Sequence, residues 1–397
     1  MKKNTEGSLH IGINALYLLP GKVGGAETYT RNLVKWLAAI DPRNKYSIFI
    51  NKESAGIFEA LAPGITVVPC PIRATSRPIR ILWEQFVLPF QVRSHKIDVL
   101  LSTGLTSPIF CPAKSVLVLY DLQHINQPHN FHRMYLLFLK SIIYASAKSA
   151  DGIITISNHV KNDIVKFYRI APERIAVSHL GVDRELFSDH RPPLTAAIKE
   201  RYALPERYLL YAAASLPHKN HARLFEALVH AKKQIPELKL LLIGARDKGE
   251  DALVRKIREL GLENDVILLG WVPFEDVPLI YQGCEAFVFP TLHEGFGLPV
   301  IEAMACGVPV ICSHMEPLIE VAGDAALFVN PLDPEAIASG IVSLLQSQKM
   351  RSELVAKGYR RAQEFGWENT ARTTLDFVSS VSGAPRCLPA IGGNPRL

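Results

Sequence analysis

Apolar strand-like runs alternate with amphipathic helical stretches along this chain, and the alternation occurs twice. In the first helical stretch, residues 26–40, apolar side chains recur at helical spacing, at Tyr29, Leu33 and Leu37 among others. The strand-like runs of the first half are residues 10–19, 45–50, 65–70, 96–102, 114–121 and 152–157. Those of the second half are residues 208–214, 239–245, 266–270, 286–290, 309–312 and 326–329. Strands separated by helices predict parallel sheets with right-handed crossovers.

A stretch without either pattern, residues 179–200, separates the two runs, and Pro192 and Pro193 mark irregular chain within it. The length of 397 residues suits two domains that each bury a core. We therefore predict two doubly wound α/β domains that face each other across a cleft, with ligands at the carboxyl ends of the strands. The predicted divisions are residues 1–190, residues 191–365, a helix at 366–382 that packs back on the first domain, and a disordered tail at 383–397.

Several classes of protein are disfavoured by composition. No apolar run reaches the 18 or so residues of a membrane span, and the longest candidate, residues 134–147, is interrupted by Lys140. The first ten residues have no apolar segment after their lysines, so we expect no secretory signal and a cytoplasmic protein. The six cysteines show neither C-x-x-C nor zinc-site spacing, which favours free thiols.

Charge is distributed unevenly between the two halves. Residues 1–180 contain 21 Lys and Arg against 11 Asp and Glu, whereas residues 181–397 contain 23 against 27. A basic half favours an anionic partner such as a membrane surface, a phosphorylated acceptor or a nucleic acid. Ordinary solvated charge remains the alternative interpretation.

The segment HEGFGLPVIEA, residues 293–303, is the most informative motif. It follows a strand that ends at Pro290, and Pro299 suits the first position of a helix. Gly295, Phe296, Gly297 and Leu298 then form the turn into that helix, with backbone amides available to phosphate or sugar oxygens.

Two carboxylates flank this turn. Glu294 precedes it, and Glu302 is expected in the first turn of the helix. One carboxylate can accept both hydroxyls of a ribose, and the other can accept a hydroxyl of a sugar. An exposed surface helix would have little use for Gly-Phe-Gly at this point.

Two further segments could bind an anion. Lys219 lies just before a helix that begins after Asn220, where a cation opposes the helix dipole unless an anion binds between them. Gly24 and Gly25 precede the helix of residues 26–40 and could present backbone amides to phosphate, although an ordinary strand-to-helix turn explains them equally well.

Asp121 and His124 follow the strand of residues 114–121, at the carboxyl end that is expected to face the cleft. Both are candidate catalytic residues. A lone histidine is more often structural than functional, so that interpretation of His124 stays open.

Together these segments resemble the retaining glycosyltransferases of family 4. The block from Glu294 to Glu302 resembles the E-x7-E signature of that family. Residues 24–34, 151–183, 216–228 and 317–341 resemble further family segments, and the resemblance covers roughly residues 9–380. It implies the GT-B fold of two Rossmann-like domains and transfer of a hexose from a nucleotide sugar.

The resemblance also implies roles for individual residues. Lys219 would bind the donor diphosphate, Glu302 the ribose, and Glu294 the donor sugar. The amides of residues 295–298 would contact sugar or phosphate, and the two glycines at 24 and 25 would approach the phosphate. Such transfer needs no divalent metal or other cofactor, and the sequence contains no D-x-D triplet.

Two positions depart from the family pattern. Many members carry an arginine five residues before the lysine, where this chain has Ala214, with Ser215 beside it as a further expected donor contact. Many members also have a histidine before the aspartate, where this chain has Tyr120. Either change could reduce activity.

The favoured hypothesis is a retaining, metal-independent hexosyltransferase of cell-surface polysaccharide or glycolipid synthesis. It would use GDP-mannose first, or a UDP-sugar, and a glycan or lipid-linked acceptor, with no nucleic acid partner. Residues 71–96 place Arg73, Arg77, Arg80 and Arg93 among aromatic side chains, which suits a peripheral position on an anionic membrane, at the inner face of the cell membrane. The alternatives are a sugar-nucleotide epimerase or hydrolase and a catalytically degenerate binding subunit.

Overall fold

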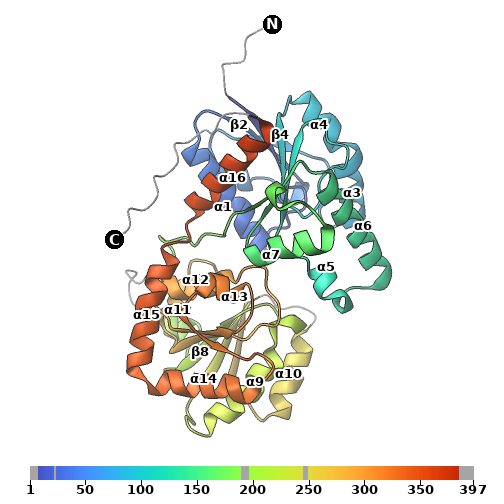
Figure 1. Ribbon diagram of the computed structural model, residues 1–397. Coiled ribbons are helices and arrows are strands. Elements are labelled where there is room, and N and C mark those ends of the chain that lie inside the picture. The colour runs from blue at the N-terminus through green and yellow to red at the C-terminus, as the bar shows by residue number, and fades with distance from the viewer. Residues whose placement is uncertain (1–7, 22–23, 189–195, 245–248, 384–397) are drawn as a thin grey trace. The chain divides into compact units, whose positions relative to one another are not determined.

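The computed structural model describes residues 8–21, 24–188, 196–244 and 249–383. The chain divides into two units, residues 1–181 with 367–397 and residues 182–366 (Figure 1). The division lies before the predicted boundary at residue 190, because Phe187 is buried in the second unit, where its ring packs 5.6 Å from Phe274 and 6.1 Å from Tyr281. The predicted disordered tail falls almost wholly outside the described residues.

The first unit contains a seven-stranded parallel sheet with the order β3-β2-β1-β4-β5-β6-β7. Its strands are β1 (His10–Asn14), β2 (Lys45–Ile50), β3 (Thr66–Pro69), β4 (Val99–Ser102), β5 (Lys114–Leu119), β6 (Gly152–Thr155) and β7 (Ile175–Val177). Its helices are α1 (Gly25–Ile40), α2 (Ile57–Leu61), α3 (Arg77–Phe86), α4 (Leu88–Ser94), α5 (Gln123–Asn126), α6 (Arg133–Ser149), α7 (Asn158–Asp163) and α16 (Trp367–Ser382). Because β1 lies between β2 and β4, the strand order reverses at the pair β1/β4.

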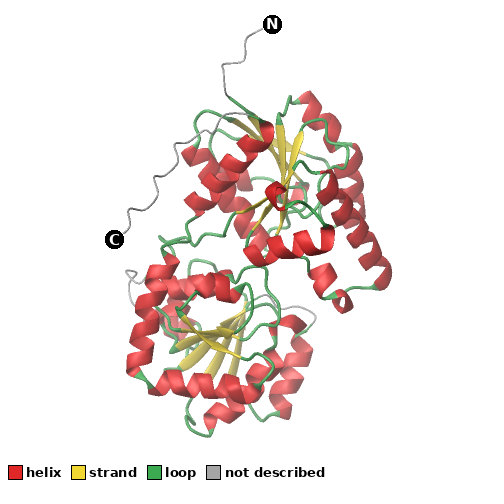
Figure 2. Cartoon of the chain, in the orientation of Figure 1, coloured by secondary structure: helices red, strands yellow, loops and turns green. Residues whose placement is uncertain are grey.

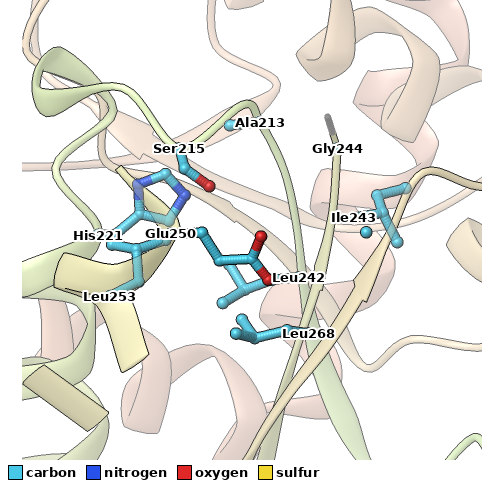
Figure 3. Close-up of a pocket in the computed structure, with 10 residues that line it drawn as sticks. Ala213, Ser215, His221, Leu242, Ile243, Gly244, Glu250, Leu253 and Leu268 are labelled. Carbon is cyan, nitrogen blue, oxygen red and sulfur yellow. The ribbon is translucent and has the colours of Figure 1, made fainter. Parts of the chain in front are cut away.

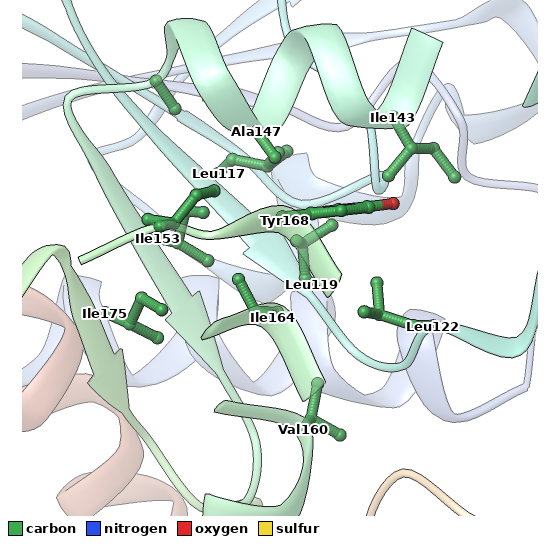
Figure 4. Packing of buried hydrophobic residues seen from close by; sticks show 12 residues of the cluster. Leu117, Leu119, Leu122, Ile143, Ala147, Ile153, Val160, Ile164, Tyr168 and Ile175 are labelled. Carbon is green, nitrogen blue, oxygen red and sulfur yellow. The ribbon is translucent and has the colours of Figure 1, made fainter. Parts of the chain in front are cut away.

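Helices cover both faces of this sheet (Figure 2). On one face, side chains from β5, β6, β7, α6, α7 and the segment that follows α7 form a continuous apolar cluster (Figure 4). Its members include Leu117, Ile143, Ile153, Ile164 and Ile175, all nearly inaccessible to water. Near-continuous apolar strands are expected of a parallel sheet that is buried on both faces.

Helix α16 lies with the first unit although it ends the described chain. It packs against α1, where the rings of Tyr29 and Trp367 lie 6.4 Å apart. Thr370 donates its hydroxyl to the carbonyl of His179 at 2.7 Å. Gly152 of β6 permits the close approach, because a Cβ there would lie 2.8 Å from the ring of Phe377.

The second unit contains a six-stranded parallel sheet with the order β10-β9-β8-β11-β12-β13. Its strands are β8 (Tyr208–Ala212), β9 (Lys239–Ile243), β10 (Val266–Gly270), β11 (Ala286–Phe289), β12 (Val310–Ser313) and β13 (Ala326–Val329). Its helices are α8 (Ala196–Arg201), α9 (His221–Lys232), α10 (Glu250–Glu259), α11 (Val277–Gln282), α12 (Leu298–Ala305), α13 (Leu318–Ala322), α14 (Pro334–Gln346) and α15 (Gln348–Ala362). Here the order reverses at the pair β8/β11.

The predicted alternation of strands and helices, repeated in two parallel sheets, is confirmed. Local details differ. The first strand ends at Asn14 rather than near residue 19, and α7 is capped by Ser157, whose hydroxyl accepts from the amide of Val160 at 3.2 Å. Helices α3 and α4 were not predicted as helices. None of the helices within the described residues is long and apolar enough to cross a bilayer.

Helix α16 supplies a direct test of the packing of the first unit. Leu375 is 1% exposed, so Leu375→Ala should lower the free energy of unfolding by about 2–4 kcal/mol through lost apolar contact and a residual cavity. Thr373→Ala, at an exposed position of the same helix, is the control and should change it by less than about 0.5 kcal/mol. Chemical unfolding monitored by circular dichroism measures both, and equal effects would contradict the packing.

Candidate functional site

Two loops of the second unit meet where the strand order reverses, the position at which open α/β sheets bind ligands. One loop follows β8 and the other follows β11. The amide of Leu292 donates to the carbonyl of His218 at 2.7 Å, and the Thr291 hydroxyl donates to the same carbonyl at 3.1 Å. Asn220 donates its side-chain amide to the carbonyl of Pro290 at 2.8 Å. The topology therefore brings together two segments that are about 70 residues apart in the sequence.

An ion pair between Lys219 and Glu294 lies at this junction. The Lys219 Nζ is 2.6 Å from Glu294 Oε1, and the side chains are only 17% and 13% exposed. The ammonium group also lies 5.6 Å from the centre of the Phe289 ring, and the Tyr211 hydroxyl donates to the Lys219 carbonyl at 2.5 Å. Two residues with separately predicted roles are thus in direct contact.

Histidines on either side of Lys219 add no positive charge at neutral pH. Burial, with the nearby Lys219 ammonium, lowers the pKa of His218 to about 3. The same two causes lower the pKa of His221 to about 4, and its ring packs 4.9 Å from Tyr211. Asn220 occupies the N-cap position of α9 with a left-handed backbone, so the predicted start of the helix after Asn220 is confirmed, although its side chain accepts no hydrogen bond from the helix amides.

The turn after Glu294 requires glycine at one position. Gly297 has φ 102°, and a Cβ there would lie 2.4 Å from Leu318 Cδ2. Helix α12 begins at the next residue, so the backbone of residues 295–298 curves tightly into the start of a helix. Phe296 is 2% exposed and its ring packs 5.7 Å from Phe365. Its side chain therefore anchors the turn, and its backbone is the part that could contact a ligand.

Glu302 is the fifth residue of α12, and the expectation that it lies in the first helical turn is wrong because the helix begins at Leu298. Its carboxylate is half-buried, and the hydroxyl of Tyr281 donates to Oε2 at 3.4 Å. Loss of hydration raises the pKa of Glu302 to about 7, partly offset by the Tyr281 hydroxyl. Tyr281, which comes from α11, was not among the residues predicted for the site.

A small pocket opens at the carboxyl ends of β8, β9 and β10 (Figure 3). Its polar side chains are Ser215, His221 and Glu250, and the remaining lining is apolar or glycine. Gly244 has φ 145°, and a Cβ there would lie 2.3 Å from the carbonyl oxygen of Ala213, so glycine is needed where β9 ends. Ser215 was predicted, whereas Glu250 was missed because nothing in its local pattern distinguishes it from an exposed helical acid.

The predicted residues of the first unit lie at the carboxyl edge of its own sheet. Gly24 precedes α1 with φ 54° and ψ −128°, a conformation that favours glycine, although a Cβ would meet open space. Gly25 is the first residue of α1. Residues 22 and 23 of the same loop fall outside the described residues.

Asp121 and Tyr120 directly follow β5. Asp121 is half-buried, and its Oδ1 accepts from the amide of Gln123 at 3.1 Å. The Tyr120 hydroxyl donates to the carbonyl of Thr103 at 2.8 Å, and its ring meets that of Tyr29 edge-on at 5.3 Å. Burial raises the pKa of Tyr120 well above its usual value, so the phenol stays protonated.

His124 is buried within the first unit. It is 3% exposed, and Nε2 is 2.7 Å from the Tyr168 hydroxyl. Burial, with Lys140, lowers the pKa of His124 to about 4. This geometry favours a packing role over the predicted catalytic one. Within the described residues, no group of three or more His, Cys, Asp and Glu side chains could hold a metal ion.

Comparison with known proteins identifies the family. A model described as glycosyl transferases group 1 matches residues 196–361, and one described as Glycosyltransferase Family 4 matches residues 23–186. O-antigen chain mannosyltransferase B of Escherichia coli is 31% identical over 268 residues, which are 66% of this chain and 69% of that protein. The chain belongs to glycosyltransferase family 4. O-antigen chain mannosyltransferase RfbU of Salmonella typhimurium is 28% identical over 322 residues, 79% of this chain and 86% of that protein.

The fold agrees with this family. A crystal structure of Anabaena Alr3699/HepE in complex with UDP and glucose matches with a TM-score of 0.74 at 20% identity, covering 94% of this chain and 100% of that one. The protein therefore has the GT-B fold, and as a family 4 enzyme it is a retaining hexosyltransferase.

The resemblance implies that Glu302 holds the ribose, and with that role its raised pKa predicts a pH-dependent affinity for nucleotide sugar. Ribose hydroxyls donate to an ionised carboxylate, so binding should favour the deprotonated form and release a proton near pH 6–7. Affinity should be about tenfold weaker at pH 6 than at pH 8, because a carboxyl with a pKa of about 7 is mostly protonated at pH 6. His218 and His221 do not contribute to this pH dependence, because their pKa values of about 3 and about 4 lie well below the range from pH 6 to pH 8.

Calorimetry in buffers of different ionisation enthalpy measures both the affinity and the proton release. Glu302→Gln cannot ionise and serves as the control, so its affinity should be flat over this range. An equal pH slope in wild type and Glu302→Gln would assign the titration to another group.

Proposed function

We propose that this protein transfers a hexose from a nucleotide sugar to a glycan or lipid-linked acceptor in cell-surface polysaccharide or glycolipid synthesis. The observation that carries the proposal is the Lys219–Glu294 pair at the β8/β11 junction. In it, Lys219 would hold the donor diphosphate, Glu294 a hydroxyl of the donor sugar, and Glu302 the ribose. Ser215 and the amides of residues 295–298 would add donor contacts.

The donor is proposed to be GDP-mannose first and a UDP-hexose second. Support for mannose comes from the relatives, two of which are named O-antigen chain mannosyltransferases. Support for UDP comes from the Anabaena structure, which contains UDP and glucose. Screening GDP-, UDP- and ADP-sugars by thermal shift separates the donors, since a ligand stabilises the folded state according to its concentration relative to Kd.

Transfer is proposed to proceed without a divalent metal, with the charge of the leaving diphosphate stabilised by Lys219 and by backbone amides. Gly24 and Gly25 are retained as further phosphate contacts. Gly24 lies directly before α1, and it has no side chain that would block the approach of a phosphate to the backbone. Asp121 is retained as the catalytic candidate of the first unit. Adding a chelator should leave the rate unchanged, and a loss that Mg²⁺ or Mn²⁺ restores would refute this part.

Two alternative functions can be distinguished from glycosyl transfer by experiment. A sugar-nucleotide epimerase or hydrolase would convert the donor with no acceptor present, so product analysis with donor alone distinguishes it. A degenerate binding subunit is suggested by Ala214, which leaves the family arginine position without a cation, and by Tyr120, whose hydroxyl already donates to Thr103. That hypothesis requires Glu294→Ala to retain function in the cell.

We further propose that the enzyme works in the cytoplasm, peripherally on the inner face of the cell membrane, with an anionic membrane surface as a partner. The basic first half of the sequence and the predicted lipid-linked acceptor support this location. No role for nucleic acid is proposed.

Removing the cation of the site should weaken donor binding. Lys219→Met keeps much of the side-chain volume but deletes the charge-assisted hydrogen bonds to phosphate, and leaves Glu294 unpaired. Loss of such bonds usually costs about 1–3 kcal/mol, so Kd should rise about 5- to 150-fold. Calorimetric titration with the nucleotide sugar found in the screen measures the change.

Lys349→Met is the matched control. Lys349 also faces a glutamate, Glu353, at 4.0 Å, but its side chain is 87% exposed and belongs to no candidate site. The Lys349→Met variant should bind nucleotide sugar with the affinity of the wild type. Unchanged affinity in Lys219→Met would remove the proposed donor site.

A further inference from the structure

Helix α3 exposes a row of apolar side chains and buries two charged ones, the reverse of an ordinary surface helix. Ile79, Leu82 and Phe86 are 58%, 56% and 68% exposed, at the spacing of one helical face. On the inner face, Arg80 is 7% exposed and Glu84 is fully buried. A water-facing helix buries its apolar side and exposes its charges, so the outer face of α3 is built for a non-aqueous contact.

The buried charges of α3 are well satisfied and fix the orientation of the helix. Arg80 Nη1 lies 3.2 Å from Glu84 Oε2, and Asn14, at the end of β1, donates its side-chain amide to the same oxygen at 3.1 Å. Gln85 donates to the carbonyl of Ser107 at 2.9 Å and accepts from the amide of Ile109 at 2.9 Å. Turning the apolar face inward would leave these polar groups without partners, so its exposure is not a loose placement.

The apolar surface continues onto neighbouring elements of the first unit. Helix α6 is tied to α3 by Arg77, whose Nη1 donates to the Tyr135 hydroxyl at 3.0 Å, and α3, α4 and α6 lie on one side of this unit (Figure 1). Nine of the thirteen large exposed hydrophobic side chains of the described residues belong to α3, α4, α6 and residue 110, so they are concentrated on these elements of the first unit. They are Ile79, Leu82, Phe86, Phe90, Phe110, Met134, Leu137, Phe138 and Tyr144. We call this set the α3–α6 face.

The sequence segments that carry the α3–α6 face are rich in positive charge. Residues 72–97 and 122–150 contain a single acidic residue, Glu84, and it is buried against Arg80. The same ranges contain Arg73, Arg77, Arg93, Lys96, Arg133, Lys140 and Lys148 in addition to Arg80. A gathered apolar surface among positive charges matches the interface of a bilayer that contains anionic lipid.

We propose that the α3–α6 face docks this enzyme on an anionic phospholipid bilayer. Phe86 and Phe90 enter the interfacial region, and the surrounding arginines and lysines pair with lipid phosphates. Arg80 and Trp83, which the sequence pattern placed in such a surface, turn inward and take no part: Arg80 is paired with Glu84, and Trp83 is half-buried. The inference rests on the proposed function in that a lipid-linked acceptor would be presented at the same bilayer.

Docking through α3 also reaches the sheet edge that carries candidate site residues. Glu84 contacts Asn14 at the carboxyl end of β1, and Asn14 donates to the Ser102 hydroxyl at the end of β4, at 3.3 Å. Asp121 follows β5, the next strand of this sheet. The docked helix would therefore hold this edge at a fixed depth relative to the lipid headgroups.

Vesicle flotation tests the docking directly. The full-length protein is mixed with phosphatidylcholine vesicles or with vesicles that also contain phosphatidylglycerol. We expect flotation with the anionic vesicles, little with the neutral ones, and release as salt is raised, because screening weakens attraction between exposed charges. Failure to float with anionic vesicles, or equal flotation with both kinds, would overturn the proposal.

Variants assign the binding to this face. Leu82→Gln with Phe86→Gln removes two exposed apolar side chains, and the bound fraction should fall on the order of tenfold, since interfacial binding scales with buried apolar area. Leu332→Gln, a 61% exposed position in the second unit, is the matched control and should float like the wild type. Equal flotation of the double variant and the wild type would overturn the assignment.

Calorimetric titration of the same preparations with nucleotide sugar, without vesicles, separates this inference from the proposed function. The double variant should bind nucleotide sugar with the affinity of the wild type, which also shows that it is folded. For the wild-type protein, normal nucleotide affinity without vesicle binding would refute the docking alone, whereas vesicle binding without nucleotide affinity would refute the proposed function alone.

Discussion

The ion pair between Lys219 and Glu294 is the interaction on which the candidate site depends. Two opposite charges with side chains 17% and 13% exposed have lost much of their hydration, and each compensates the other. The pair exists because β8 and β11 are neighbours in the sheet, although α9, β9, α10, β10 and α11 lie between them in the sequence. A diphosphate entering here would replace the carboxylate as the partner of the ammonium, and would free Glu294 to accept a sugar hydroxyl.

Features of the candidate site were predictable from the sequence where they depend on neighbouring residues, and not where they depend on the order of strands in the sheet. The turn at Gly297 was predictable, because its glycine and the following proline act within a few residues of chain. The position of Glu302 in its helix was not, because α12 starts one residue earlier than the proline suggested. The contact of Lys219 with Glu294 depends on strand order, which no local pattern encodes; only the family resemblance pointed to a shared ligand.

In the first unit, the sequence did not predict which side chains of α3 face the solvent. Arginines and aromatics at residues 71–96 suggested a basic interfacial surface, yet a list of residues does not say which face of a helix they occupy. The buried pair of Arg80 with Glu84 decides that question for α3, because it leaves the apolar side chains outside. His124 illustrates the reverse case. Its place after a strand end suggested catalysis, whereas the structure buries its side chain with Nε2 at 2.7 Å from the Tyr168 hydroxyl.

The most direct test of the central claim is a crystal structure of the protein with an intact nucleotide sugar bound. We expect Lys219 Nζ within hydrogen-bonding distance of a diphosphate oxygen, with the 2.6 Å contact to Glu294 lengthened and Glu294 facing a sugar hydroxyl. A bound donor whose diphosphate lies away from Lys219, with the Lys219–Glu294 contact intact, would contradict it.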